Sequence, residues 1–156
     1  MNWEAIGAVG EILGALAVVA TLGYLANQIR QNTRASQASA HQSLTEAAAT
    51  MNAMVASDTE VARLWSVAFK SGLETLEETD RVRFNFIVGQ WFLAFESVYI
   101  QHELGTLQDD FFSAKMENLK NMLKGPGVRE SWKRNEKEYT LGFRKYVGKQ
   151  LLDDDA

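Results

Sequence analysis

The sequence predicts an all-α protein, in which a long N-terminal transmembrane helix continues into a small helical bundle. Two observations support this fold class. An apolar run extends from Ala5 to Ala26, and farther along apolar residues recur at helical spacing, with one Pro in the chain and no strand-like alternation. We therefore divide the chain into a transmembrane helix at 1–27, a juxtamembrane helical stalk at 28–56, a helical bundle at 57–152 and an acidic tail at 153–156.

The apolar run has the length and composition of a membrane span. It contains no Lys, Arg, Asn, Gln, Asp or Pro, and its one carboxylate is Glu11. About 20 apolar residues are enough to cross the ~30 Å hydrocarbon core of a bilayer. A signal peptide is one alternative, but residues 1–4 carry no Lys or Arg and the run is longer than the apolar segment of such peptides. The core helix of a soluble protein is the other alternative.

The residues that flank the run indicate an orientation. Trp3 and Tyr24 bracket it, as expected for aromatic side chains at the two membrane interfaces. Arg30 and Arg34 follow it closely, and no Lys or Arg precedes it. The positive-inside rule then predicts an inner (cytoplasmic) membrane protein with its N-terminus outside and its bundle in the cytoplasm, in contact with membrane lipid.

The energetics of insertion favour partner helices. Nine Leu, Ile or Val residues between Ala5 and Ala26 contribute roughly 3–5 kcal/mol to insertion. One charge at the helix centre costs about 2.5–3.5 kcal/mol. A lone helix with Glu11 ionised therefore inserts only marginally, and other helices around Glu11, or its protonation, would relieve the cost.

One side of this helix suits contact with other helices. At about 100° per residue, small and polar residues gather there with one valine. They are Gly7, Gly10, Glu11, Gly14, Val18, Thr21, Gln28 and Asn32. Small residues four apart let helix backbones approach closely. We interpret this side as the seam of a homo-oligomer, and alternatively as the lining of a pore with a ring of Glu11.

The stalk and the first bundle helices follow from periodicity and capping patterns. Leu44, Ala48, Met51 and Val55 share one helix face, although a flexible linker is an alternative for the polar stretch before them. Three patterns predict helix starts. They are Ser57-Asp58-Thr59-Glu60 for a helix to Ser71, Thr75-Leu76-Glu77-Glu78 for one to about Leu104, and Thr106-Leu107-Gln108-Asp109 for one to about Lys124. Gly125-Pro126-Gly127 predicts a break, followed by helices at 128–137 and 140–152.

The helix that ends near Leu104 is apolar on more than one face, which predicts a buried central helix; a second membrane span is the alternative. Glu96 is a carboxylate within it. Buried acids need partners, so we expect a buried ion pair with Arg63, Arg81 or Arg144.

Catalytic and metal signatures are absent from the sequence. There is no Cys, and neither His41 nor His102 follows a Glu by three residues, as a di-iron bundle requires. No nucleophile elbow or phosphate-binding loop occurs. A net charge of −4 offers no argument for nucleic acid. We expect no catalytic residue, metal or cofactor, and no enzyme activity.

The chain resembles a family of small uncharacterised bacterial proteins with an N-terminal single-pass membrane helix and a helical cytoplasmic domain. The likeness is most specific at the start of the chain, and Val98 departs from it where the family has an aromatic residue. The matching segments are 3–8, 10–15, 28–33, 81–84, 95–96, 105–107, 127–132 and 143–147. The resemblance implies a fold and a location but no reaction.

These observations together predict a homo-oligomeric single-pass membrane protein that acts in assembly, as a scaffold, or as a sensor. The alternative is an oligomeric channel that conducts ions or protons past Glu11.

Overall fold

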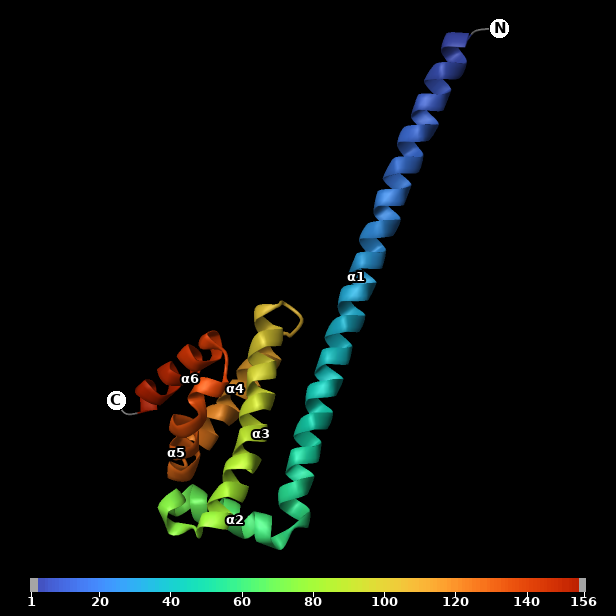
Figure 1. Ribbon diagram of the computed structural model, residues 1–156. Helices are drawn as coiled ribbons and strands as arrows, with labels where there is room; N and C mark the ends of the chain where they lie inside the picture. The colour runs from blue at the N-terminus through green and yellow to red at the C-terminus, as the bar shows by residue number, and fades with distance from the viewer. Residues whose placement is uncertain (1–2, 155–156) are drawn as a thin grey trace. The chain divides into compact units, whose positions relative to one another are not determined.

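The computed structural model describes residues 3–154, and these are helical with no strand (Figure 1). The α-helices are α1 (Trp3–Ser57), α2 (Thr59–Ser71), α3 (Glu78–Glu103), α4 (Asp109–Leu123), α5 (Pro126–Asn135) and α6 (Leu141–Asp154). Two short 3₁₀ helices, η1 (Leu73–Thr75) and η2 (Glu136–Glu138), join α2 to α3 and α5 to α6. The all-α fold class, with a long N-terminal helix followed by a bundle, is confirmed.

The chain divides into two compact units between Ala38 and Ser39, within α1. The predicted stalk at 28–56 therefore belongs to both units. From Ala40 onward α1 contributes to the bundle, where Leu44 is buried. No linker interrupts the helix, because no Gly or Pro occurs between Tyr24 and Ser71. The predicted acidic tail begins inside α6, and Asp155 and Ala156 lie outside the described residues.

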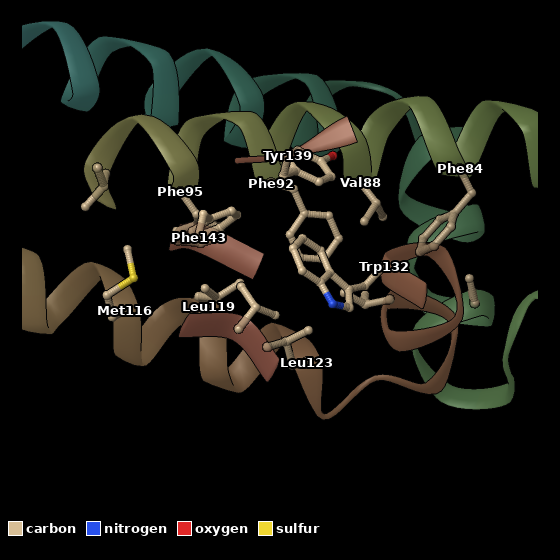
Figure 2. Packing of buried hydrophobic residues seen from close by; sticks show 14 of the residues in the cluster. Phe84, Val88, Phe92, Phe95, Met116, Leu119, Leu123, Trp132, Tyr139 and Phe143 are labelled. Atoms are coloured by element: carbon tan, nitrogen blue, oxygen red, sulfur yellow. The ribbon is translucent and has the colours of Figure 1, made fainter. Parts of the chain in front are cut away.

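The bundle core is built on aromatic side chains from α3, α5 and α6 (Figure 2). Trp132 is 2% exposed, and its ring lies 4.8 Å from that of Phe92 and 5.7 Å from that of Phe143, centroid to centroid. Tyr139 stacks on Trp132 at 5.2 Å. Such pairs add to the free energy that burial alone contributes. Leu119 and Leu123 of α4 complete this core beside Trp132.

Burial of Tyr139 raises its pKa to about 12, with smaller contributions from the charges of Glu138 and Glu96. The folded state therefore favours the neutral phenol. The contribution of the neutral phenol to the free energy of unfolding is fully present below the usual tyrosine pKa of about 10. It is lost as the pH rises through the pKa of Tyr139 in the folded protein.

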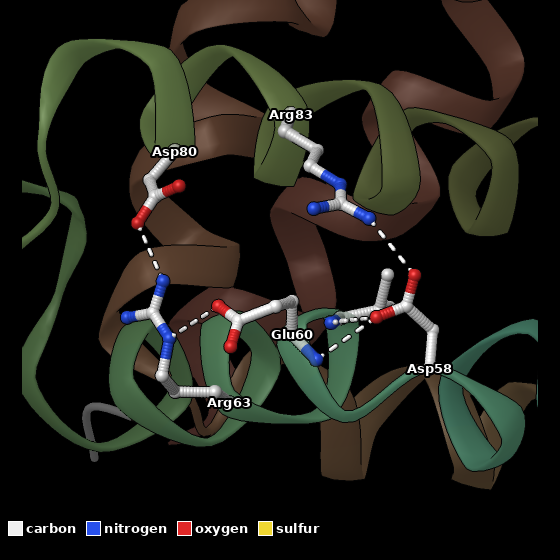
Figure 3. Close-up of polar contacts among 6 residues, drawn as sticks. Asp58, Glu60, Arg63, Asp80 and Arg83 are labelled. Carbon is white, nitrogen blue, oxygen red and sulfur yellow. Dashed lines mark hydrogen bonds and ion pairs between the residues drawn. The ribbon is translucent and has the colours of Figure 1, made fainter.

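The start of α2 differs from the sequence-based prediction by one residue. Ser57 is the last residue of α1, and Asp58 is the N-cap of α2. Its Oδ1 accepts hydrogen bonds from the backbone N–H groups of Glu60 at 2.9 Å and Val61 at 3.1 Å (Figure 3). Asp58, and not Ser57, is the N-cap because its carboxylate reaches two free N–H groups of the first helical turn.

Ion pairs join the first turns of α2 and α3 (Figure 3). The second oxygen of Asp58 accepts a hydrogen bond from Arg83 at 3.1 Å. Arg63 bridges Glu60 at 2.9 Å and Asp80 at 2.7 Å. These side chains are partly exposed, so each pair contributes little by itself, but together they set how the two helices begin.

We expect Asp58→Ala to lower the melting temperature at neutral pH and to lose that effect in acid. The hydrogen bond from the Val61 N–H, helped by those of Glu60 and by the charge of Arg83, holds the pKa of Asp58 below its usual 3.8. A carboxyl group whose pKa is lower in the folded state stabilises the fold at pH values above its pKa in the unfolded chain. This contribution is lost as the pH falls through its pKa in the folded protein. Near-UV circular dichroism melts of the full chain, from pH ~7 down to about 3, measure both effects.

Ser57→Ala is the matched control for this prediction. Since Ser57 caps nothing, its melting temperature should follow the wild type at every pH. If Ser57→Ala proved the more damaging change, the capping assignment at Asp58 would be wrong.

The other two capping patterns also do not act as predicted. Thr75 ends η1 and donates its hydroxyl to the Gly72 carbonyl at 2.8 Å, while α3 begins at Glu78. Thr106 donates to the Gln101 carbonyl at 2.8 Å, so it closes α3 instead of opening α4. In both cases the threonine satisfies a carbonyl of the preceding segment, an alternative that short polar side chains often take.

Two glycines, Gly72 at the end of α2 and Gly127 in α5, are required by the contact between these two helices. Gly72 has φ +86°, a conformation that favours glycine, and the next residue, Leu73, donates its N–H to Glu130 of α5 at 2.7 Å. A Cβ on Gly127 would lie 2.5 Å from the Ala68 carbonyl oxygen, so α2 and α5 approach too closely for any larger residue. A break between α4 and α5 is confirmed, but it lies at 124–125: α5 begins at Pro126, two residues earlier than predicted, because Pro is well suited to the first helical turn.

Helix α3 is central, but it is not buried all round. Phe84, Ile87, Val88, Phe92 and Phe95 face the core. Four large apolar residues on the other side of α3 are exposed instead, with Phe86 at 73% and Val82, Leu93 and Ile100 less so. The prediction of a buried central helix is thus confirmed for the side of α3 that faces the core, while the opposite side is exposed.

Candidate functional site

Residues 7–36 of α1 are all exposed. Among residues 3–154, α1 is the one helix long and apolar enough to cross a membrane, by length and composition, and no residue of its most apolar 18-residue window is buried. Nine large aliphatic side chains among residues 7–36 are exposed. They are Val9, Ile12, Leu13, Leu16, Val18, Val19, Leu22, Leu25 and Ile29. An apolar surface of this extent marks a membrane or protein contact.

The small and polar face of α1 has no partner within its own unit. A Cβ built on Gly7, Gly10 or Gly14 would meet no atom within 4 Å. These glycines therefore have no packing role in a single copy of the chain, and each lowers intrinsic helix stability by about 1 kcal/mol relative to Ala. Glu11 and Val18 are likewise exposed on α1.

Two polar residues of this face, Thr21 and Gln28, form hydrogen bonds within α1. Thr21 donates its hydroxyl to the Ala17 carbonyl at 2.8 Å, which satisfies it without a partner helix. Gln28 donates to the Tyr24 hydroxyl at 2.9 Å. Asn32 is exposed one turn farther along. The hydroxyl of Thr21 is thus already paired, whereas Glu11 keeps its carboxylate for other groups.

The predicted interface anchors are also exposed. Trp3 and Tyr24 have most of their side chains uncovered. Arg30 and Arg34 are exposed in the polar part of α1. Their exposure is compatible with contacts to lipid head groups, for which amphipathic aromatic rings and long cationic side chains are suited.

Glu96 is buried, with 9% of its surface exposed, as the sequence predicts. Its partner, however, is a backbone group and not an arginine. Its Oε1 accepts a hydrogen bond from the Thr140 N–H at 2.6 Å, just before α6 begins. The predicted ion pair is not found: Arg63 pairs with Asp80 and Arg81 with Glu74, and no ion pair within residues 3–154 joins Glu96 to Arg144. The carboxylate of Glu96 therefore fixes the start of α6 against α3, a structural role.

We expect Glu96→Ala to destabilise the bundle by about 1–3 kcal/mol, because the Thr140 N–H would lose its acceptor in a partly buried place. Glu96→Gln keeps an acceptor oxygen and should lose less. Chemical denaturation of the full chain, followed by tryptophan fluorescence, measures both changes. Equal losses for the two variants would indicate that the charge of Glu96, and not this hydrogen bond, is what the bundle needs.

The two histidines take part in aromatic contacts. His102 lies flat on Phe112 at 3.9 Å between ring centroids, and its Nε2 is 2.9 Å from a carboxylate oxygen of Asp109. His41 of α1 contacts Phe111 at 4.3 Å. Within the described part of the chain, no three His, Cys, Asp or Glu side chains come together in a group that could hold a metal ion.

A cavity of about 460 Å³ lies inside the second unit, and sequence reasoning missed it. Its walls come from the C-terminal part of α1 and from α2, α3 and α4. The lining residues are Leu44, Ala48, Met51, Asn52, Val55, Trp65, Phe69, Trp91, Ala94, Phe95, Val98, Lys115, Asn118, Asn121 and Met122. The predicted face of Leu44, Ala48, Met51 and Val55 forms one wall, so the periodicity was visible but not the space that it encloses.

Comparison with protein-family models, with curated proteins and with solved structures finds no match to this chain.

Proposed function

We propose that this chain is a homo-oligomeric single-pass membrane protein, with the segment 1–27 in the inner membrane and the helical bundle in the cytoplasm. The supporting observation is the exposed apolar part of α1, together with a glycine face that nothing in its own unit covers. Arg30 and Arg34 after the apolar run favour the orientation with the N-terminus outside.

Self-association accounts for the position of Glu11. A lone acid within an apolar membrane segment is costly when it faces lipid, and less costly when it faces protein or water. Gly10 and Gly14 lie one turn apart beside Glu11 and permit close backbone approach between copies. Several copies packed through this face would remove Glu11 from lipid. The role that fits is assembly, a scaffold or a sensor, in which the bundles are brought together by α1.

The test is the mass of the full chain extracted from membranes in mild detergent, measured by native mass spectrometry. We expect a discrete oligomer for the wild type, and dissociation for Gly10→Leu and Gly14→Leu. Gly23→Leu is the matched control, since Gly23 lies on the opposite side of α1 and is equally open. A wild-type chain that is monomeric in the membrane would remove the proposal.

A channel is the second candidate, favoured by the polar residues Glu11, Thr21, Gln28 and Asn32 on one side of α1. In an oligomer this side would surround a central path with a ring of Glu11 carboxylates. Ion or proton flux into liposomes that contain the full chain is the measurement, and Glu11→Gln should alter it strongly. Flux that Glu11→Gln and Glu11→Ala leave unchanged would argue against conduction.

A further inference from the structure

The cavity among α1, α2, α3 and α4 has the dimensions of a ligand site. Its volume of about 460 Å³ falls within the range of pockets that enclose drug-sized molecules. Trp65 and Trp91 stand 6.2 Å apart on its wall and remain only partly buried, although both pack against the core. The cavity thus leaves aromatic surface uncovered, and covering that surface with an apolar ligand is favourable.

The lining of the cavity is chemically uneven. Helices α2 and α3 contribute only apolar side chains to it, among them Phe69, Trp91 and Phe95. Its polar side chains come mostly from α4, as Lys115, Asn118 and Asn121, with Asn52 added by α1. A ligand that fits must therefore have a long apolar part and a polar group at one place.

Lys115 determines the charge of that polar group. It is the one charged residue on the described lining, and none of the ion pairs within residues 3–154 includes it. Its ammonium lies over the Phe111 ring, 5.1 Å from the centroid, which holds the side chain beside the cavity without neutralising it. A carboxylate on the ligand would pair with Lys115 in a charge-assisted hydrogen bond.

We propose that this cavity binds a single-chain anionic amphiphile of the fatty-acid class. The acyl chain lies against Trp65, Trp91 and Phe95, and the carboxylate lies at Lys115 with the amides of Asn118 and Asn121 as further donors. The proposal does not rest on the membrane crossing or on the oligomer, because every lining residue belongs to the second unit.

The experiment uses the full chain in phosphatidylcholine nanodiscs and a photoreactive diazirine analogue of palmitate. After illumination, mass spectrometry of peptides locates the adducts. We expect adducts on peptides that contain Met51, Trp91 or Met122, and we expect unlabelled palmitate to displace them while the neutral alcohol of the same length does not. Adducts confined to residues 3–26 would report bulk lipid contact alone and would overturn the proposal.

Two variants separate the apolar and the charged parts of the site. Ala48→Trp fills the cavity, and it should lower the yield of cavity adducts about tenfold. Its control, Ala47→Trp, changes the neighbouring exposed residue and should keep the wild-type yield. Lys115→Gln should weaken palmitate competition roughly tenfold, with exposed Lys145→Gln as its control. An unchanged yield of cavity adducts in Ala48→Trp would refute the assigned site. Unchanged palmitate competition in Lys115→Gln would refute the role of its charge.

Discussion

Phe92→Ala destabilises the bundle by about 3–5 kcal/mol, whereas Phe86→Ala on the same helix changes its stability by less than about 0.5 kcal/mol. Phe92 is 1% exposed and contacts the rings of Trp132 and Tyr139, at 4.8 and 5.9 Å between centroids. Removing its ring leaves a cavity among α3, α5 and η2 that the close-packed surroundings cannot fill. Phe86 is 73% exposed, so its truncation removes little packing.

Denaturant titration of the full chain in nanodiscs, followed by near-UV circular dichroism, measures the pair. Both changes remove the same phenyl ring from the same helix, so differences in helix propensity cancel between them. Similar losses for the two variants would contradict the assignment of Phe92 to the core and Phe86 to the exposed side of α3.

If α1 spans the membrane as proposed, we expect Leu16→Arg combined with Val19→Arg to release the full chain from it. Both side chains are exposed on α1, away from the side that carries Gly10 and Glu11, so the double change adds charge without blocking that side. Each arginine near the centre of the span costs about 2.5–3.5 kcal/mol. Together they exceed the roughly 3–5 kcal/mol that the apolar side chains contribute, even before Glu11 is counted.

Carbonate extraction and flotation of membranes measure this release. The control adds the same two charges to the polar part of α1, as Gln31→Arg with Ala35→Arg, and should leave the chain in the membrane fraction. A double variant at Leu16 and Val19 that still floats with the lipid would show that another part of the chain holds it there.

Local patterns in the sequence predicted the elements well and their first residues poorly. The stops at Gly72 and Gly105 are confirmed, because a glycine with positive φ ends a helix through its own backbone conformation. The starts predicted at Ser57, Thr75 and Thr106 were each misplaced. A hydroxyl near a helix end has carbonyls and N–H groups within equal reach, and which of them it meets depends on the path of the preceding segment.

The candidate sites divide in the same way. The small and polar face around Glu11 follows from helical periodicity alone, since one helix places those residues on one side. The partner of Glu96 could not be predicted, because the Thr140 N–H lies 44 residues away and a backbone donor leaves no mark in the sequence. The cavity beside Lys115 was equally hidden, because four helices that are distant in sequence enclose it.

The sequence by itself determined the all-α class, the single long apolar helix and the side of that helix on which glycines surround an acid. These depend on composition and on a repeat of 3.6 residues, which are local properties. Only the tertiary structure decided that Phe92 is buried while Phe86 is not, that Glu96 holds the start of α6, and that a cavity lined by Trp91 and Lys115 remains in the bundle. Burial and enclosure depend on which distant side chains fill the neighbouring space, and packing settles that only when the whole chain has folded.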